Sequence, residues 1–97
     1  MTFAVRYTYV DDPALLDEHR PEHRAFLADL AEEGVLLVSG PFGADGPAGA
    51  LLVLRGSSSE EVRERLTADP FQRRGLVERV EVRAWTPVLG PWSAVVG

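Results

Sequence analysis

The chain has 97 residues, of which 45% are hydrophobic and 26% are charged. This length and composition are typical of one globular domain and leave too little chain for two independent cores. The net charge of −5 argues against a nucleic-acid partner, which requires a clustered basic surface. The absence of cysteine excludes disulfides, thiol nucleophiles and cysteine-based zinc sites. All 10 basic residues are arginine, so no lysine is available to form a Schiff base.

Two further features concern the location of the protein. No basic stretch followed by a long apolar run stands at the N-terminus, so we expect no secretory signal. No apolar run approaches the roughly 20 residues that a membrane helix requires. We therefore expect a cytoplasmic protein without a membrane partner.

The first third of the chain predicts a strand followed by a helix. Residues 3–10 alternate in hydrophobicity, with four apolar or aromatic side chains on one face: Phe3, Val5, Tyr7 and Tyr9. A helix is predicted from Pro21 to Glu33, because proline suits the first turn and Gly34 fits the C-terminal cap. Residues 14–18 are expected to form a separate turn, since the residue before a proline avoids helical angles.

The rest of the chain predicts three more strands and a second helix. Strands are expected at 35–39, ended by Gly40-Pro41, then at 50–55 and at 77–88. Three serines at 57–59 followed by two glutamates predict a helix that runs to about Ala68. The order βαββαβ indicates a ferredoxin-like α+β fold with a four-stranded antiparallel sheet. We expect one domain over residues 1–90 and a short tail over residues 91–97.

The predicted sheet has one face without helices. Strand 50–55 is apolar on both sides, and Trp85 lies on the more polar side of the last strand. Because a monomer rarely exposes so much apolar surface, a second copy of the chain is the expected cover. The alternative is that the tail, with Trp92, Val95 and Val96, folds back over this face.

His23 is the first candidate for chemistry. It lies on the apolar stripe of the predicted helix 21–33, where burial and the positive helix end both disfavour the imidazolium form. A neutral imidazole accepts a proton, which is what a general base must do. The alternative is a structural histidine that is hydrogen-bonded to a backbone carbonyl.

His19 and His23 are four residues apart, a spacing that can place two imidazoles on one metal ion. Pro21 lies between them and no third ligand is evident, so we expect no metal site.

Asp69 stands in the sequence Asp69-Pro70-Phe71 after the second predicted helix. Its structural role would be to cap the next turn, with Phe71 packing inward; its functional role would be to orient a histidine. Ser39-Gly40-Pro41 ends a strand and could present polar groups to a ligand, although Gly-Pro also simply terminates strands.

The chain resembles the YciI-like (YCII-related) family. The resemblance rests on motifs spread over nearly all of the chain: Arg20-Pro21-x-His23, Gly34-x-Leu36, Ser39-Gly40-Pro41, Gly49, Ser59-x-Glu61, Ala68-Asp69-Pro70-Phe71, Gly75 and Val80-x-Val82-x-x-Trp85. It implies a homodimer of the dimeric α/β barrel type and an active site built around His23 and Asp69. Gly49-Ala50 departs from the Gly-Ser that is common in the family, so a serine hydroxyl is missing there.

Together these features predict an enzyme that acts on a small molecule without a cofactor, by elimination or isomerisation. His23 would be the general base or acid, Asp69 would orient it, and the substrate would contact Arg20, Ser39, Gly40, Pro41 and Phe71. One difficulty is that His23 begins one predicted helix while Asp69 follows the other, so nothing in the topology guarantees that they meet. The alternative function is a non-catalytic dimeric module that binds a small ligand in the same cavity.

Overall fold

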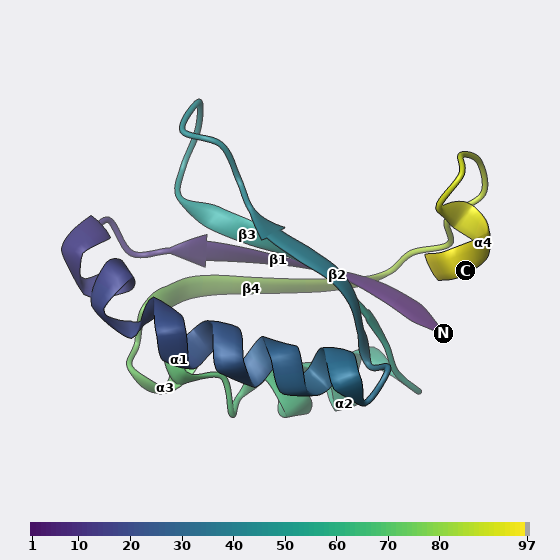
Figure 1. Cartoon of the computed structure of the whole chain (residues 1–97), viewed down its shortest axis with the longest axis horizontal. Coiled ribbons are helices and arrows are strands. Elements are labelled where there is room, and N and C mark those ends of the chain that lie inside the picture. Colours follow the sequence, from purple (N-terminus) through teal and green to yellow (C-terminus); the bar gives the residue numbers. More distant parts are fainter. Residues whose placement is uncertain (97) are drawn as a thin grey trace.

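The computed structural model describes residues 1–96, and the side chains of residues 1–94. Its elements are β1 (Thr2–Tyr9), α1 (Pro13–Glu32), β2 (Leu36–Pro41), β3 (Gly49–Arg55), α2 (Ser59–Leu66), α3 (Pro70–Arg73), β4 (Val77–Ala84) and α4 (Ser93–Val96). The strands form one antiparallel sheet in the order β2-β3-β1-β4, and α1, α2 and α3 lie along one of its faces (Figure 1). This arrangement confirms the predicted ferredoxin-like fold. No helix within the described residues is long and apolar enough to cross a membrane.

The core lies between the sheet and the helices. The predicted alternation of β1 is confirmed, because Phe3, Val5, Tyr7 and Tyr9 are all buried on the helix side. Leu52 and Leu54 of β3 continue this layer, and the helices close it with their own buried side chains: Leu16, Leu27, Leu30, Val62, Leu66 and Phe71. The central strand β1 therefore carries the residues around which the rest packs.

Helix α1 is longer than the sequence predicts. It begins at Pro13, and Pro21 lies inside it instead of at its start. Asp12 caps the true N-terminus by accepting a hydrogen bond from the Leu15 N–H at 3.2 Å, and Leu16 is buried. This capping and packing outweigh the cost of an internal proline, about 3 kcal/mol. The ribbon of α1 changes direction between its first turns and the remainder (Figure 1), as expected at a proline.

Other boundaries also differ from the prediction. Gly40 and Pro41 continue β2 instead of ending it, because Pro41 pairs with Ala50 at the edge of the sheet, where a missing N–H is tolerated. Helix α2 ends at Leu66, and Asp69 is the N-cap of the short helix α3, which begins at Pro70. Strand β4 ends at Ala84, where its pairing with β1 runs out at Phe3.

The sheet face opposite the helices is only partly covered. Residues 85–93 and three side chains of the sheet, Val38, Leu51 and Val53, line a groove of about 380 Å³. Leu51 and Trp85 nevertheless remain 43% and 45% exposed. The tail therefore lines this face without covering it, while the side chains of Val95 and Val96 lie outside the described residues. The division into a domain of residues 1–90 and a tail of 91–97 stays a prediction.

Candidate active site

His23 and Asp69 meet in the interior, although they lie 46 residues apart in the chain. His23 Nδ1 is 2.9 Å from Asp69 Oδ1 and 3.0 Å from Oδ2. Because α1 starts at Pro13, His23 lies near the middle of α1 and not in its first turn. The predicted influence of the positive helix end on His23 is therefore wrong. Helix α3 folds back against α1 and delivers Asp69 to this point.

Asp69 caps α3, as its sequence context suggests, and its carboxylate also contacts His23. As the N-cap of α3, its Oδ1 accepts a hydrogen bond from the Phe71 N–H at 2.9 Å. The same carboxylate faces the His23 ring and is fully buried. The cap fixes the direction of the carboxylate, so the geometry of the His23–Asp69 pair is built into the turn.

A tyrosine completes the network around Asp69. The Tyr7 hydroxyl donates to Asp69 Oδ2 at 2.9 Å and accepts a hydrogen bond from Gln72 Nε2 at 3.2 Å. Burial, followed by the charge of Asp69, raises the pKa of Tyr7 far above its ordinary value, so the hydroxyl keeps its proton. The Phe71 N–H and the Tyr7 hydroxyl thus both donate hydrogen bonds to the Asp69 carboxylate.

This set of donors determines which nitrogen of His23 carries the proton. A carboxylate can only accept hydrogen bonds, and both oxygens of Asp69 already accept from Phe71 and Tyr7. Nδ1 of His23 must then donate its N–H to Asp69. The neutral ring therefore has its lone pair on Nε2, the nitrogen on the other side of the imidazole. This arrangement differs from a structural histidine bonded to a backbone carbonyl.

Aromatic packing holds the imidazole plane. Phe71 stacks on His23 with ring centroids 4.0 Å apart and planes inclined by 4°. The Tyr9 and His23 rings are nearly perpendicular, with their centroids 6.5 Å apart. The guanidinium carbon of Arg20 lies over the Phe71 ring, 5.9 Å from its centroid. Phe71 is fully buried behind His23 and does not line the pocket described next. Its position supports a role in orienting His23 rather than in touching a substrate.

A pocket of about 160 Å³, here called the histidine pocket, opens beside His23. Its lining comes from α1, β1, β2 and β3: Tyr9, Arg20, His23, Arg24, Leu27, Ser39, Gly40, Pro41, Ala50 and Leu52. Four residues expected to contact a ligand, Arg20 and the Ser39–Pro41 segment, are thus brought together with His23. Ala50 also faces this pocket, at the position where the resemblance implies a serine. Asp69 lies behind the imidazole and does not line the pocket.

Several residues of the site escaped the sequence-based reasoning. The sequence pattern assigned Tyr7 and Tyr9 to the buried face of a strand and gave them no role in the site. A buried phenol usually needs a hydrogen-bonding partner, and this need could have identified Tyr7 as part of a polar network. Arg24 lies one helical turn after Arg20 and so shares its face, a spacing that was available in the sequence. Gln72 offered no such signal, because its partner comes from a distant strand.

A metal site finds no support in the geometry. Nε2 of His19 is 3.8 Å from Glu18 Oε2, and His19 does not line the histidine pocket. No group of three or more potential ligands gathers anywhere among residues 1–96.

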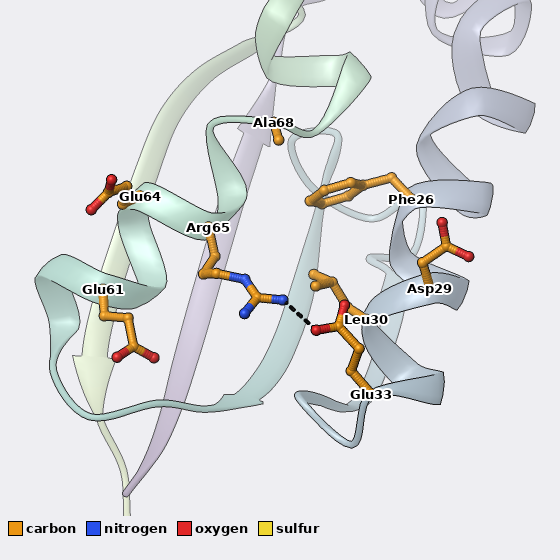
Figure 2. A pocket seen from close by; sticks show the side chains of 8 residues that line it. All are labelled: Phe26, Asp29, Leu30, Glu33, Glu61, Glu64, Arg65 and Ala68. Atoms are coloured by element: carbon orange, nitrogen blue, oxygen red, sulfur yellow. Dashed lines mark hydrogen bonds and ion pairs between the residues drawn. The ribbon is translucent and has the colours of Figure 1, made fainter.

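A second, wider hollow, here called the interhelix groove, separates α1 from α2 and measures about 630 Å³ (Figure 2). It is lined by Phe26, Asp29, Leu30, Glu33, Glu61, Glu64, Arg65 and Ala68. Arg65 reaches across it to Glu33 with a distance of 2.9 Å between Nη2 and Oε1. None of the residues expected to act in chemistry or binding lines this groove.

Solved structures with related folds include enzymes that act on small molecules. The 5-chloro-2-hydroxyhydroquinone dehydrochlorinase TftG from Burkholderia phenoliruptrix AC1100, in complex with 2,5-dihydroxybenzoquinone, is 25% identical, with a TM-score of 0.75 over 88% of this chain and 93% of that one. The protein Atu4242 from Agrobacterium tumefaciens is 26% identical, with a TM-score of 0.54 over 91% and 94% of the two chains.

The cofactor-independent oxygenase SnoaB from Streptomyces nogalater shares the fold at 19% identity and a TM-score of 0.53, over 91% of this chain and 94% of that one. No curated protein matches the chain. The model of the YCII-related domain matches residues 1–86. The chain therefore belongs to the YCII-related family, within the dimeric α/β barrel superfamily.

Proposed function

We propose that this protein is an enzyme that uses His23 as a general base, oriented by Asp69, to act on a small molecule without a cofactor. The observation that carries the proposal is the buried contact of His23 Nδ1 with Asp69 at 2.9 Å, which leaves Nε2 as the basic nitrogen beside the pocket. A histidine with a purely structural role needs no buried carboxylate, since a backbone carbonyl would satisfy it.

The reaction favoured by this arrangement is an elimination. His23 Nε2 removes a proton from a carbon of the substrate, and the electron pair forms a double bond while a leaving group departs from the neighbouring carbon. The imidazolium that results is stabilised by the carboxylate of Asp69 that it contacts. In an isomerisation, His23 would return the same proton to another atom of the substrate. Catalysis of this kind supplies about 10²–10⁴ in rate, and orientation in the pocket would supply the rest.

The similarity to TftG supports an elimination over other proton transfers. TftG is a dehydrochlorinase, and at 25% identity it covers most of both chains. Removing HCl needs a base for the proton and no redox partner, which agrees with the His23–Asp69 pair. The size of the histidine pocket, about 160 Å³, suits a substrate no larger than a substituted single ring.

The test is a comparison of the two histidines. The wild type, His23→Gln and His19→Gln are incubated with chlorinated hydroquinones, including 5-chloro-2-hydroxyhydroquinone, and chloride release is measured. Exchange of substrate C–H for deuterium in D₂O is followed in parallel, so that proton abstraction is seen even without elimination. We expect His23→Gln to lose at least about 10²-fold in rate and His19→Gln to keep the wild-type rate. Binding without either reaction would contradict the enzyme and favour the ligand-binding module.

We further propose that two copies of the chain pair through the sheet face opposite the helices. Leu51 and Trp85 on this face and Trp92 on the tail expose large apolar side chains, with Trp92 74% exposed. Sedimentation of the wild type should give twice the mass of the chain, and Leu51→Arg should shift the mass toward the monomer. A monomeric wild type at high concentration would contradict this pairing. Location in the cytoplasm stays a prediction.

A further inference from the structure

The histidine pocket carries positive charge in a protein whose net charge is −5. Arg20 and Arg24 both line it, and the described residues of its wall include no carboxylate. The two arginines lie one helical turn apart on α1, with His23 between them in the chain. The pocket thus places two guanidinium groups and one imidazole on one wall, opposite apolar side chains of the sheet.

The two guanidinium groups differ in how they are held. Arg20 pairs with Asp17 at 3.3 Å and lies over Phe71, the ring that also stacks on His23. Arg24 is exposed and forms no ion pair with the residues that the structure describes. Arg20 therefore has partners within the chain, whereas the guanidinium of Arg24, which lines the same pocket, is available to pair with a ligand.

Both arginines act on Tyr9, which lines the same pocket. Burial, followed by the negative charge of Asp69, raises the pKa of Tyr9 to about 12, while Arg20 and Arg24 act in the opposite direction. Both positive charges are thus within electrostatic reach of the Tyr9 phenol, which itself lines the pocket. Asp69 does not line the pocket, whereas both arginines do, so a negatively charged group bound there can contact the two guanidinium groups directly.

We propose that the substrate of this site is a single-ring anion, whose carboxylate or acidic hydroxyl oxygen is bound by Arg24 and Arg20 while its reacting edge faces His23. A volume of about 160 Å³ leaves room for one substituted ring, and planar guanidinium groups bind such oxygens with paired hydrogen bonds. A neutral compound of the same shape would leave Arg24 without a partner and gain nothing from the field. The inference rests on the proposed function only in taking this pocket as the substrate site.

The experiment compares two ligands of nearly the same size and shape, of which one is an anion and the other is neutral. Binding of 2,5-dihydroxybenzoate and of its neutral amide, 2,5-dihydroxybenzamide, is measured by calorimetry for the wild type, Arg24→Gln, Arg24→Lys and Arg20→Gln. Arg73→Gln, which removes the same charge from an exposed position outside the pocket, is the matched control. We expect the wild type to bind the anion at least about tenfold more tightly than the amide, as for a charged hydrogen bond that is partly exposed to water.

Arg24→Gln should lower the affinity for the anion by about tenfold and leave that for the amide unchanged, while Arg24→Lys keeps most of the preference. Equal affinity for the two ligands in the wild type would overturn the proposal. So would a preference that survives in the double variant Arg20→Gln/Arg24→Gln, or the absence of any binding at millimolar concentration. Repeating the titration with His23→Gln separates the two proposals, because charge selection survives the loss of the base even if no reaction is ever found.

Discussion

Helix α1 contributes to two hollows of opposite character. Its residues at 20, 23, 24 and 27 line the histidine pocket, and those at 26, 29 and 30, together with the C-cap Glu33, line the interhelix groove. The groove is about four times as large, about 630 Å³ against about 160 Å³, and its wall carries four carboxylates and one guanidinium. The pocket wall carries two guanidinium groups and no carboxylate among the described residues.

The larger of the two hollows is therefore not the one that contains the candidate active site. The carboxylates of the groove are in contact with water, and the Arg65–Glu33 pair joins two half-exposed side chains. A hydrogen bond from Ser57 holds the pKa of the exposed Glu61 carboxyl below its ordinary value, so this group stays an ordinary anion. Behind the pocket, by contrast, the fully buried carboxylate of Asp69 is paired with a histidine and a tyrosine. Charges that are removed from water interact strongly, whereas exposed charges are screened.

The sharpest test of this contrast is Asp69→Asn. The Phe71 N–H bonds to Oδ1 of Asp69 and the Tyr7 hydroxyl to Oδ2, so an amide, which has one oxygen, can accept from only one of them. With its oxygen on the backbone N–H of Phe71, the amide places its NH₂ group in the position of Oδ2, 3.0 Å from His23 Nδ1, where it favours an accepting Nδ1. The proton of His23 then moves to Nε2, and the base is lost. We expect a fall of about 10²–10⁴ in rate, and ¹⁵N NMR of the ring should show the change of tautomer. Asp29→Asn, in the groove, is the control; an unchanged His23 tautomer in Asp69→Asn would contradict the assignment.

Tyr7→Phe should have the next largest effect. It removes one hydrogen bond from the buried Asp69 and one from Gln72, so the free energy of unfolding should fall by about 1.5–3 kcal/mol. Urea denaturation measures this change. Tyr9→Phe is the matched control, because the Tyr9 hydroxyl forms no hydrogen bond with the described residues. An equal fall in the free energy of unfolding for Tyr7→Phe and Tyr9→Phe would show that the hydrogen bond from Tyr7 to Asp69 contributes no stability of its own.

Alkaline pH should lower the free energy of unfolding, because Tyr7 and Tyr9 are buried in the folded state. The pKa of both Tyr7 and Tyr9 is raised in the folded state, that of Tyr9 to about 12, whereas in the unfolded chain both ionise near pH 10. Stability is therefore complete below about pH 10 and is lost as the pH rises above it, by about 1 kcal/mol for each tyrosine at pH 11. Denaturation at about pH 9 and pH 11 measures this loss, and Tyr7→Phe should show a smaller loss than the wild type. A wild type equally stable at both pH values would refute the prediction.

The smallest effect is expected from Arg65→Gln in the groove. Its partner Glu33 is exposed, so the free energy of unfolding should change by no more than about 0.5 kcal/mol. The ¹⁵N spectrum of the His23 ring should not change. A loss as large as that of Tyr7→Phe would mean that the groove, too, depends on a tightly paired charge.

Much of this site could be predicted from patterns along the chain. The buried face of β1, the capping role of Asp69 and the place of His23 on an apolar stripe all follow from local spacing. The true start of α1 did not follow, because Pro21 is a strong local signal against a helix and only the packing of Leu16 and the Asp12 cap overcome it. Local preference is outweighed there by tertiary contacts.

The contact of His23 with Asp69 was also beyond local reasoning. It depends on the path of α3, a four-residue helix that spacing alone does not reveal. Tyr7 and Gln72 meet across 65 residues, so only the assembled sheet and helices bring them together. The candidate residues His23 and Asp69 could be named from the chain, whereas the network that orients them is a product of the complete fold.

The exposed position of Arg24 has a consequence for how such a protein can be changed. His23 and Asp69 are anchored in the core, so their replacement disturbs folding as well as reaction. Arg24 reaches the same pocket from the surface, where substitutions cost little stability. If the proposed site is correct, ligand choice can be changed at Arg24 without altering the buried His23–Asp69 pair. One scaffold could serve several metabolites by exchanging a few surface side chains.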